Sequence, residues 1–251
     1  MMYDVLIIGA GPGGIFSAYE LTRLNPQLKI AVFEAGHPLA QRKCPIDGEK
    51  IKSCIQCKRC SIMSGFGGAG AFSDGKYNIT NDFGGTLYEY IGKKQALDLM
   101  RYVDQINMAY GGEGTKLYST AGSQFKTLCM QNDLHLLDAS VRHLGTDINY
   151  VVLENLYNDL KNKVDFFFDT PVEHVAVTDG GYEVRTHEGA YQCRHCIISV
   201  GRSGSKWMET VCHELDIPTR SNRVDIGVRV ELPAEVFAPI TDELYESKIV
   251  Y

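Results

Sequence analysis

A glycine-rich run near the N-terminus has the composition and spacing of a phosphate-binding turn. Between residues 9 and 14 the chain reads Gly9-Ala10-Gly11-Pro12-Gly13-Gly14, which is the pattern GxGxxG. In such a turn Gly9 would allow the sharp bend, Gly11 would let the backbone approach a pyrophosphate, and Gly14 would let helix and strand pack closely. The backbone N–H groups and the dipole of the following helix would then bind the phosphates.

An acidic residue lies at the distance that this pattern requires. Glu34 follows Gly14 by 20 residues, where a carboxylate accepts hydrogen bonds from the hydroxyls of an adenosine ribose. The same negative charge would repel a 2′-phosphate. The sequence therefore predicts a dinucleotide site that disfavours NADP.

Four cysteines could ligate a metal. Cys54, Cys57 and Cys60 form CxxCxxC, and Cys44 precedes them in a Cys-Pro pair. Four thiolates at this spacing suit a [4Fe–4S] cluster, for which two-cluster ferredoxins offer a similar run, or a zinc ion. A redox-active thiol pair and cysteines without metal are the other two interpretations that the spacing leaves open.

The flanking sequence predicts the elements that would position these residues. An apolar strand over 3–8, a helix over 12–24 and a second strand over 28–34 form a βαβ unit around the glycine turn. Residues 36–86 show little periodicity and hold the cysteines and the densest glycines. Further on, the pattern predicts helices over 94–109, 121–131, 146–161 and 204–215, and strands over 134–137, 164–168, 172–177, 182–186, 191–196, 196–200 and 225–232.

The three strands over 172–196, followed by an apolar strand ending at Gly201, resemble the β-meander of glutathione-reductase-type FAD domains. The resemblance implies an α/β, Rossmann-like FAD-binding fold. It also implies that a valine before the meander contacts adenine and that an arginine follows the ribose-binding acid. The positions that match, or lie beside the expected nucleotide, are Ala35, Arg42, Val172, Val200 and Gly201.

Three further segments resemble a family of uncharacterised bacterial and archaeal FAD-dependent dehydrogenases, also described as NAD-utilising dehydrogenases. They are the string from Ser64 to Lys76, His143-Leu144-Gly145-Thr146-Asp147, and Asp225 to Glu231. The resemblance implies an oxidoreductase that passes hydride or electrons through FAD, with NAD(P)H as a candidate donor and a small-molecule substrate. It places the backbone of Gly67, Gly68, Ala69 and Gly70 against the pyrophosphate or the flavin ring. It identifies no catalytic residue.

Members of that family are longer than 251 residues. We therefore expect an FAD/NAD(P)-binding domain over 1–220 and the start of a truncated second, substrate domain over 221–251. The C-terminal part of the family fold would be missing, so we also expect exposed apolar surface and a partner or second copy that completes the fold. The alternative is a non-catalytic FAD- or NAD(H)-binding module.

Composition excludes several other classes. The formal net charge is −6 and no basic stripe is present, which argues against a nucleic-acid partner. The hydrophobic fraction of 44% and charged fraction of 22% are typical of a folded domain rather than a disordered chain. No apolar run is long enough for a membrane span, and no signal peptide is present, so we expect a cytoplasmic protein.

Overall fold

The computed structural model describes residues 2–221 and 224–251. The chain clusters into two compact units, and each is built from two stretches of sequence. Unit 1 comprises Met1–Ser73 and Leu153–Asn222, and unit 2 comprises Asp74–Val152 and Arg223–Tyr251. Residues 74–152, which the sequence analysis places in the nucleotide-binding domain, thus lie in unit 2.

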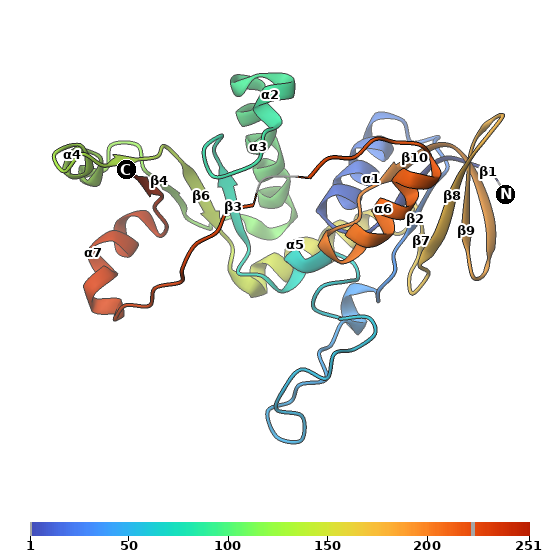
Figure 1. The fold of residues 1–251 in the computed structure, drawn as a ribbon, viewed down its shortest axis with the longest axis horizontal. Coiled ribbons are helices and arrows are strands. Elements are labelled where there is room, and N and C mark those ends of the chain that lie inside the picture. The colour runs from blue at the N-terminus through green and yellow to red at the C-terminus, as the bar shows by residue number, and fades with distance from the viewer. Residues whose placement is uncertain (1, 222–223) are drawn as a thin grey trace. The chain divides into compact units, whose positions relative to one another are not determined.

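Unit 1 is built on a six-stranded sheet (Figure 1) with the strand order β7-β2-β1-β10-β9-β8. The first four strands in that order pair in parallel, and the last two continue the sheet as an antiparallel meander. The strands are β1 (Met2–Ile8), β2 (Ile30–Phe33), β7 (Asp165–Phe167), β8 (Val172–Thr178), β9 (Gly181–Thr186) and β10 (Gly189–Ile198). The prediction of an α/β fold with a βαβ unit and a three-stranded meander is confirmed. The separate apolar strand predicted over 196–200 is wrong, because β10 is one strand that pairs with β9 through its first part and with β1 along most of its length.

Two helices of unit 1 begin close to glycines. Helix α1 (Pro12–Leu24) follows β1 directly and has Pro12 in its first turn, where a missing N–H costs nothing. Helix α6 (Ser205–Glu214) follows β10 and packs against β8. Short 3-10 turns are η1 (Leu39–Gln41), η2 (Gly68–Phe72) and η4 (Arg202–Gly204).

The core of unit 1 lies along the sheet. One cluster joins Leu6, Phe33 and Val184, from three different strands, with Val211 of α6. The rings of Phe33 and Phe167 stack at 4.7 Å between centroids. These apolar runs are buried because strands in the middle of such a sheet have no solvent-facing side.

Unit 2 has two small sheets, ordered β3-β6-β4 and β11-β5, and several helices. Its strands are β3 (Lys76–Ile79), β4 (Leu117–Ser119), β5 (His135–Leu136), β6 (Ser140–His143) and β11 (Ile249–Val250). Its helices are α2 (Leu87–Ile91), α3 (Lys93–Asn107), the π-helical turn η3 (Met108–Gly112), α4 (Gln124–Met130) and α7 (Ala234–Leu244). Helix α5 (Gly145–Leu160) has residues in both units.

The predicted strand over 225–232 is wrong. In the structure this segment forms no ladder with any described residue, although its apolar and polar side chains alternate. Ile226 and Val228 are 95% and 89% exposed. Alternation signals a strand only where a neighbouring strand supplies hydrogen bonds and cover for the apolar face. This segment is one of several places where large apolar side chains are exposed.

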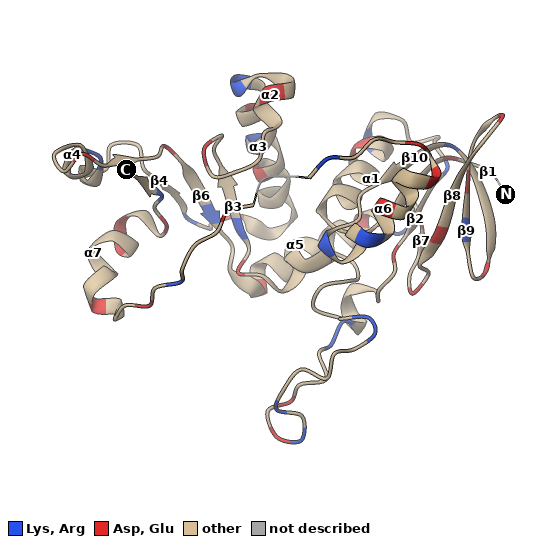
Figure 2. Ribbon diagram, in the orientation of Figure 1, with Lys and Arg blue, Asp and Glu red and all other residues tan. Residues whose placement is uncertain are grey.

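Within the described residues, no helix combines the length and the apolar character needed to cross a lipid bilayer. Lys and Arg are interspersed with Asp and Glu along the described residues of each unit (Figure 2). This distribution agrees with the absence of a basic stripe in the sequence.

Candidate functional site

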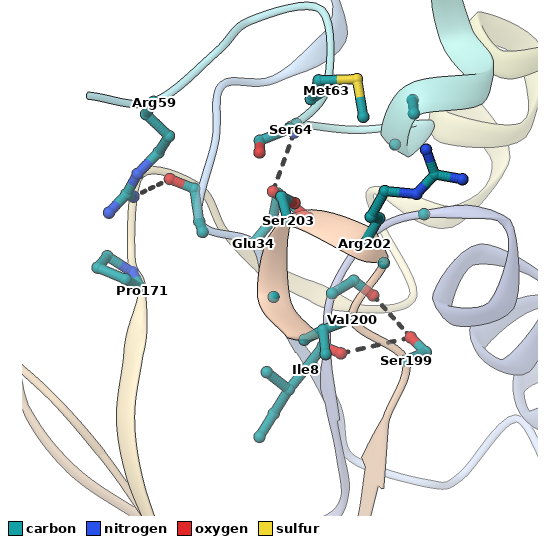
Figure 3. A pocket seen from close by; sticks show the side chains of 18 of the residues that line it. Ile8, Glu34, Arg59, Met63, Ser64, Pro171, Ser199, Val200, Arg202 and Ser203 are labelled. Atoms are coloured by element: carbon teal, nitrogen blue, oxygen red, sulfur yellow. Dashed lines mark hydrogen bonds between the residues drawn. The ribbon is translucent and has the colours of Figure 1, made fainter. Parts of the chain in front are cut away.

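A cavity of about 980 Å³ opens in unit 1 beyond the carboxyl ends of β1 and β2 (Figure 3). This edge of an open parallel sheet is where α/β proteins bind ligands. Several segments that are distant in sequence meet there. The predicted cofactor-binding residues that line the cavity are Gly9, Gly11, Pro12, Gly13, Glu34, Ala35, Gly68, Ala69, Gly70, Val172, Val200 and Gly201.

The glycine turn that begins α1 is packed as the sequence predicts. Gly9 has φ +102°, and a Cβ there would lie 2.8 Å from the carbonyl oxygen of Ser199. A Cβ on Gly14 would lie 1.9 Å from the carbonyl oxygen of Gly9. Gly14 does not line the cavity and serves the packing of helix on strand. Gly11 differs, because its nearest neighbour would be 3.9 Å away, so its open side faces the cavity.

Glu34 is buried at 6% exposure, and its carboxylate accepts three backbone hydrogen bonds. One oxygen accepts from the N–H of Ala10 at 2.8 Å. The other accepts from Gly36 at 2.8 Å and from Gly65 at 2.9 Å. The carboxylate therefore ties together the glycine turn, the loop after β2 and the second glycine-rich segment, and it also lines the cavity. Its predicted contact with a ribose stays a prediction.

Arg42 holds the chain between residues 61 and 66, which leads into the second glycine-rich segment. Its guanidinium donates to the carbonyl oxygens of Ser61, Ile62 and Phe66 at 2.9, 2.9 and 2.6 Å. It also lies 4.9 Å from the centre of the Phe72 ring. Burial lowers the pKa of Arg42 to about 10. Arg42 is not among the residues that line the cavity, so its direct contact with a nucleotide stays a prediction.

The second glycine-rich segment lies against the first. The N–H of Gly67 donates to the carbonyl of Ala10 at 2.8 Å, and a Cβ on Gly68 would lie 3.1 Å from Cα of Gly11. Gly67 itself packs against Leu153 rather than lining the cavity. Because the two glycine segments touch, the backbone of η2 forms a second side of the cavity next to the turn of α1.

A further wall of the cavity was identified only in part from the sequence, which predicted Val200 and Gly201 but not their neighbours. Ser199 donates to the carbonyl oxygens of Ile8 and Gly9 at 3.3 and 3.2 Å (Figure 3), which fixes the end of β10 beside the glycine turn. From there Arg202 and Trp207 extend the lining. The Gly-Arg-Ser-Gly run at 201–204, after the predicted strand over 196–200, was the available signal, since such runs after a strand mark a loop near the carboxyl edge.

The cavity wall is positively charged although the chain is acidic. Among its lining residues the basic ones are Lys58, Arg59 and Arg202, and Glu34 is the one acidic residue. A site with this balance favours an anionic ligand over a neutral or cationic one. The two negative charges of a dinucleotide pyrophosphate would match it.

The four candidate metal ligands are not brought together. Cys57 and Cys60 line the cavity, but Cys54 is exposed and neither it nor Cys44 does so. In the part of the chain that the structure describes, no three His, Cys, Asp or Glu side chains gather as a metal site. The reason is the path of the loop between η1 and η2, which runs outward to a turn at Asp47 and back (Figure 1). The thiols do not fit a cluster in this structure.

Unit 2 contains paired polar groups of its own. Arg142 donates to the carboxylate of Asp104 at 3.0 and 2.7 Å, with both side chains about nine-tenths buried. The hydroxyl of Tyr245 lies 2.6 Å from Nε2 of His143. These pairs connect α3 and the residue after α7 to β6, which indicates a role in holding unit 2 together.

No protein-family model and no curated protein matches the chain. Among solved structures, it is similar to glycine oxidase from Geobacillus kaustophilus, with 14% identity, a TM-score of 0.48, and coverage of 86% of this chain and 58% of that one. NikD, an unusual amino acid oxidase of nikkomycin biosynthesis, has 12% identity, a TM-score of 0.47 and coverage of 84% and 53%. Quinol fumarate reductase from E. coli has 14% identity, a TM-score of 0.47 and coverage of 81% and 33%. The chain thus spans little more than half the length of the first two structures.

Proposed function

We propose that unit 1 binds FAD in the 980 Å³ cavity and that the chain is the nucleotide-binding part of a flavin-dependent oxidoreductase. The observation that carries the proposal is the meeting of two glycine segments at the carboxyl edge of a parallel sheet, under a wall of net positive charge. The resemblance to FAD-dependent dehydrogenases described under Sequence analysis supports the same cofactor.

The residues fit the cofactor at each part of the cavity. The open side of Gly11 and the first turn of α1 would hold the pyrophosphate. Glu34, Ala35 and Val172 would surround the adenosine, and the Gly68–Phe72 turn would lie toward the flavin half. FAD, when bound, supplies two-electron oxidation and reduction. The chain's own residues bind and orient it, and NAD(P)H is the proposed electron donor.

The extent of the cavity favours FAD over NAD(H). The lining continues past the glycine turn to Met63 and Gly70 on one side and to Arg202 and Trp207 on another. A volume of about 980 Å³ is at the upper end of the range for small-molecule sites, about 300–1,000 Å³. The competing candidate is NAD(H) at the same glycine turn, in a module without flavin chemistry of its own.

Titration calorimetry and the visible spectrum of the purified chain test the proposal. We expect FAD to bind with a well-resolved flavin spectrum that dithionite bleaches, and we expect ADP to compete with it. Tighter binding of NAD than of FAD would contradict the flavin assignment and favour the non-catalytic module. A chain that binds neither nucleotide would refute the site.

A further inference from the structure

The residues from Cys57 to Cys60 form a wall of the cavity that the proposed function does not by itself explain. All four consecutive residues line the cavity, although they belong to a loop whose outer part is exposed. The loop turns at Asp47, where the side chain accepts hydrogen bonds from the N–H groups of residues 49–51, and it then returns to the cavity. The part of the loop that returns to the cavity therefore follows an ordered turn.

Three sets of contacts hold this wall in place. Arg59 donates from its guanidinium to the carbonyl oxygen of Ala35, the residue after Glu34 (Figure 3). Just beyond the wall, the carbonyl oxygen of Cys60 accepts from Met63 and Ser64 at 3.0 and 2.9 Å. The residues that follow are also held. Arg42 donates to the carbonyl oxygens of Ser61 and Ile62, and the N–H of Gly65 donates to Glu34.

The position of Arg59 identifies which part of a dinucleotide it would meet. Figure 3 shows its side chain extending toward Pro171, with the guanidinium bound to the carbonyl oxygen of Ala35, the residue after Glu34. In a βαβ dinucleotide site the acid after the second strand marks the adenosine ribose. Ala35 and Pro171, which also line the cavity, then lie beside the purine rather than the flavin. A planar guanidinium in that place can stack on an aromatic base.

We propose that the Cys57–Cys60 segment is one wall of an adenosine subsite, that the Arg59 guanidinium packs on the purine, and that covalent modification of Cys57 or Cys60 blocks the subsite. The ligand class is an adenine nucleotide. This inference rests on the proposed function, since it requires the adenosine half of the cofactor to lie at Glu34.

Alkylation by iodoacetamide, with and without nucleotide, tests the wall. In this reaction a thiolate displaces iodide, so a C–S bond forms, the C–I bond breaks and the thiol proton passes to buffer. ADP at ten times its Kd should slow alkylation of Cys57 and Cys60 about tenfold, because only the unoccupied fraction reacts. Cys54 is the internal control, since it is exposed on the same loop and does not line the cavity. Peptide mass spectrometry measures the extent of alkylation at each cysteine separately.

Riboflavin 5′-phosphate is the matched probe, because it carries the flavin half without adenosine. It should leave the alkylation of Cys57 and Cys60 unchanged. The converse treatment completes the test, since the chain alkylated at these two thiols should lose ADP binding. If FAD binds but ADP protects neither cysteine, the adenosine wall is refuted and the flavin site stands. If neither nucleotide binds, both proposals fail.

Substitutions separate stacking from charge. Arg59→Ala should weaken ADP binding about tenfold, as expected for loss of a desolvated cation–π contact. Arg59→Lys keeps the charge but not the plane, so it should weaken ADP binding nearly as much. Lys58→Ala, a change at the neighbouring cation, should have a smaller effect. Wild-type affinity for ADP in Arg59→Ala, with an unchanged circular dichroism spectrum, would overturn the role of Arg59.

Discussion

Alanine substitutions at Gly11 and Gly14 should separate binding from folding within one turn. At Gly11, φ is −75° and the nearest atom to an added Cβ is 3.9 Å away, so no strain arises. Alanine is slightly less favourable than glycine at a helix N-cap, by about 0.5 kcal/mol, and the stiffer unfolded chain offsets about the same amount. The free energy of unfolding should change by less than about 0.5 kcal/mol.

The methyl group that Gly11→Ala adds nevertheless projects into the cavity, where the pyrophosphate is proposed to lie. Overpacking at a close contact costs about 1–3 kcal/mol, which is a loss in affinity for FAD of about five-fold to 150-fold. Gly14→Ala behaves differently, because its Cβ would lie 1.9 Å from a backbone carbonyl oxygen that cannot rotate away. We expect it to lower the free energy of unfolding by about 3 kcal/mol or more.

Urea unfolding and FAD titration on the same preparations measure both quantities. Gly180→Ala is the control, because this exposed glycine has no atom within 4 Å of an added Cβ, and it should change neither quantity. Wild-type FAD affinity in Gly11→Ala would show that the pyrophosphate does not lie on this turn. Wild-type stability in Gly14→Ala would refute the packing argument.

Three further substitutions test interactions that stabilise each unit internally. Arg42→Met leaves three backbone carbonyls without their donor. The free energy of unfolding of unit 1, measured with urea, should therefore fall by about 3–5 kcal/mol. A fall below about 1 kcal/mol would contradict the supporting role of the guanidinium. Asp104→Asn leaves the nine-tenths buried Arg142 without its counter-ion and should cost unit 2 about 3 kcal/mol, whereas an unchanged unfolding curve would show that the pair is dispensable. Burial raises the pKa of Tyr3 to about 12, so the folded state holds this proton more tightly, and stability should be intact below pH 10 and fall as pH rises from about 10 to 12. Tyr3→Phe should flatten that decline, and an equally steep decline in the variant would assign it to other groups.

The elements nearest the glycine turn could be predicted closely. The helix over 12–24 has the bounds of α1, and the strands over 3–8 and 28–34 contain or overlap β1 and β2. The meander could be predicted equally well, because each hairpin has a local turn signal between strands in which apolar and polar residues alternate. Unit 2 was predicted less well. Its strands β3, β4 and β6 are three or four residues long, which is too short to show a period, so the sequence pattern does not predict them.

The sequence by itself determined that a tight glycine turn joins a strand to a helix at residues 9–14, because strand, glycines, helix and acid are all encoded within about 30 residues of local pattern. Only the tertiary structure decided what surrounds that turn. It brought Ser199 to Gly9 across 190 residues, used the carboxylate of Glu34 to join three backbone segments, and placed Arg42 behind the cavity and Arg59 on its wall. These assignments are non-local, since each depends on which segment packs beside another, and a pattern along the chain carries no information on that choice.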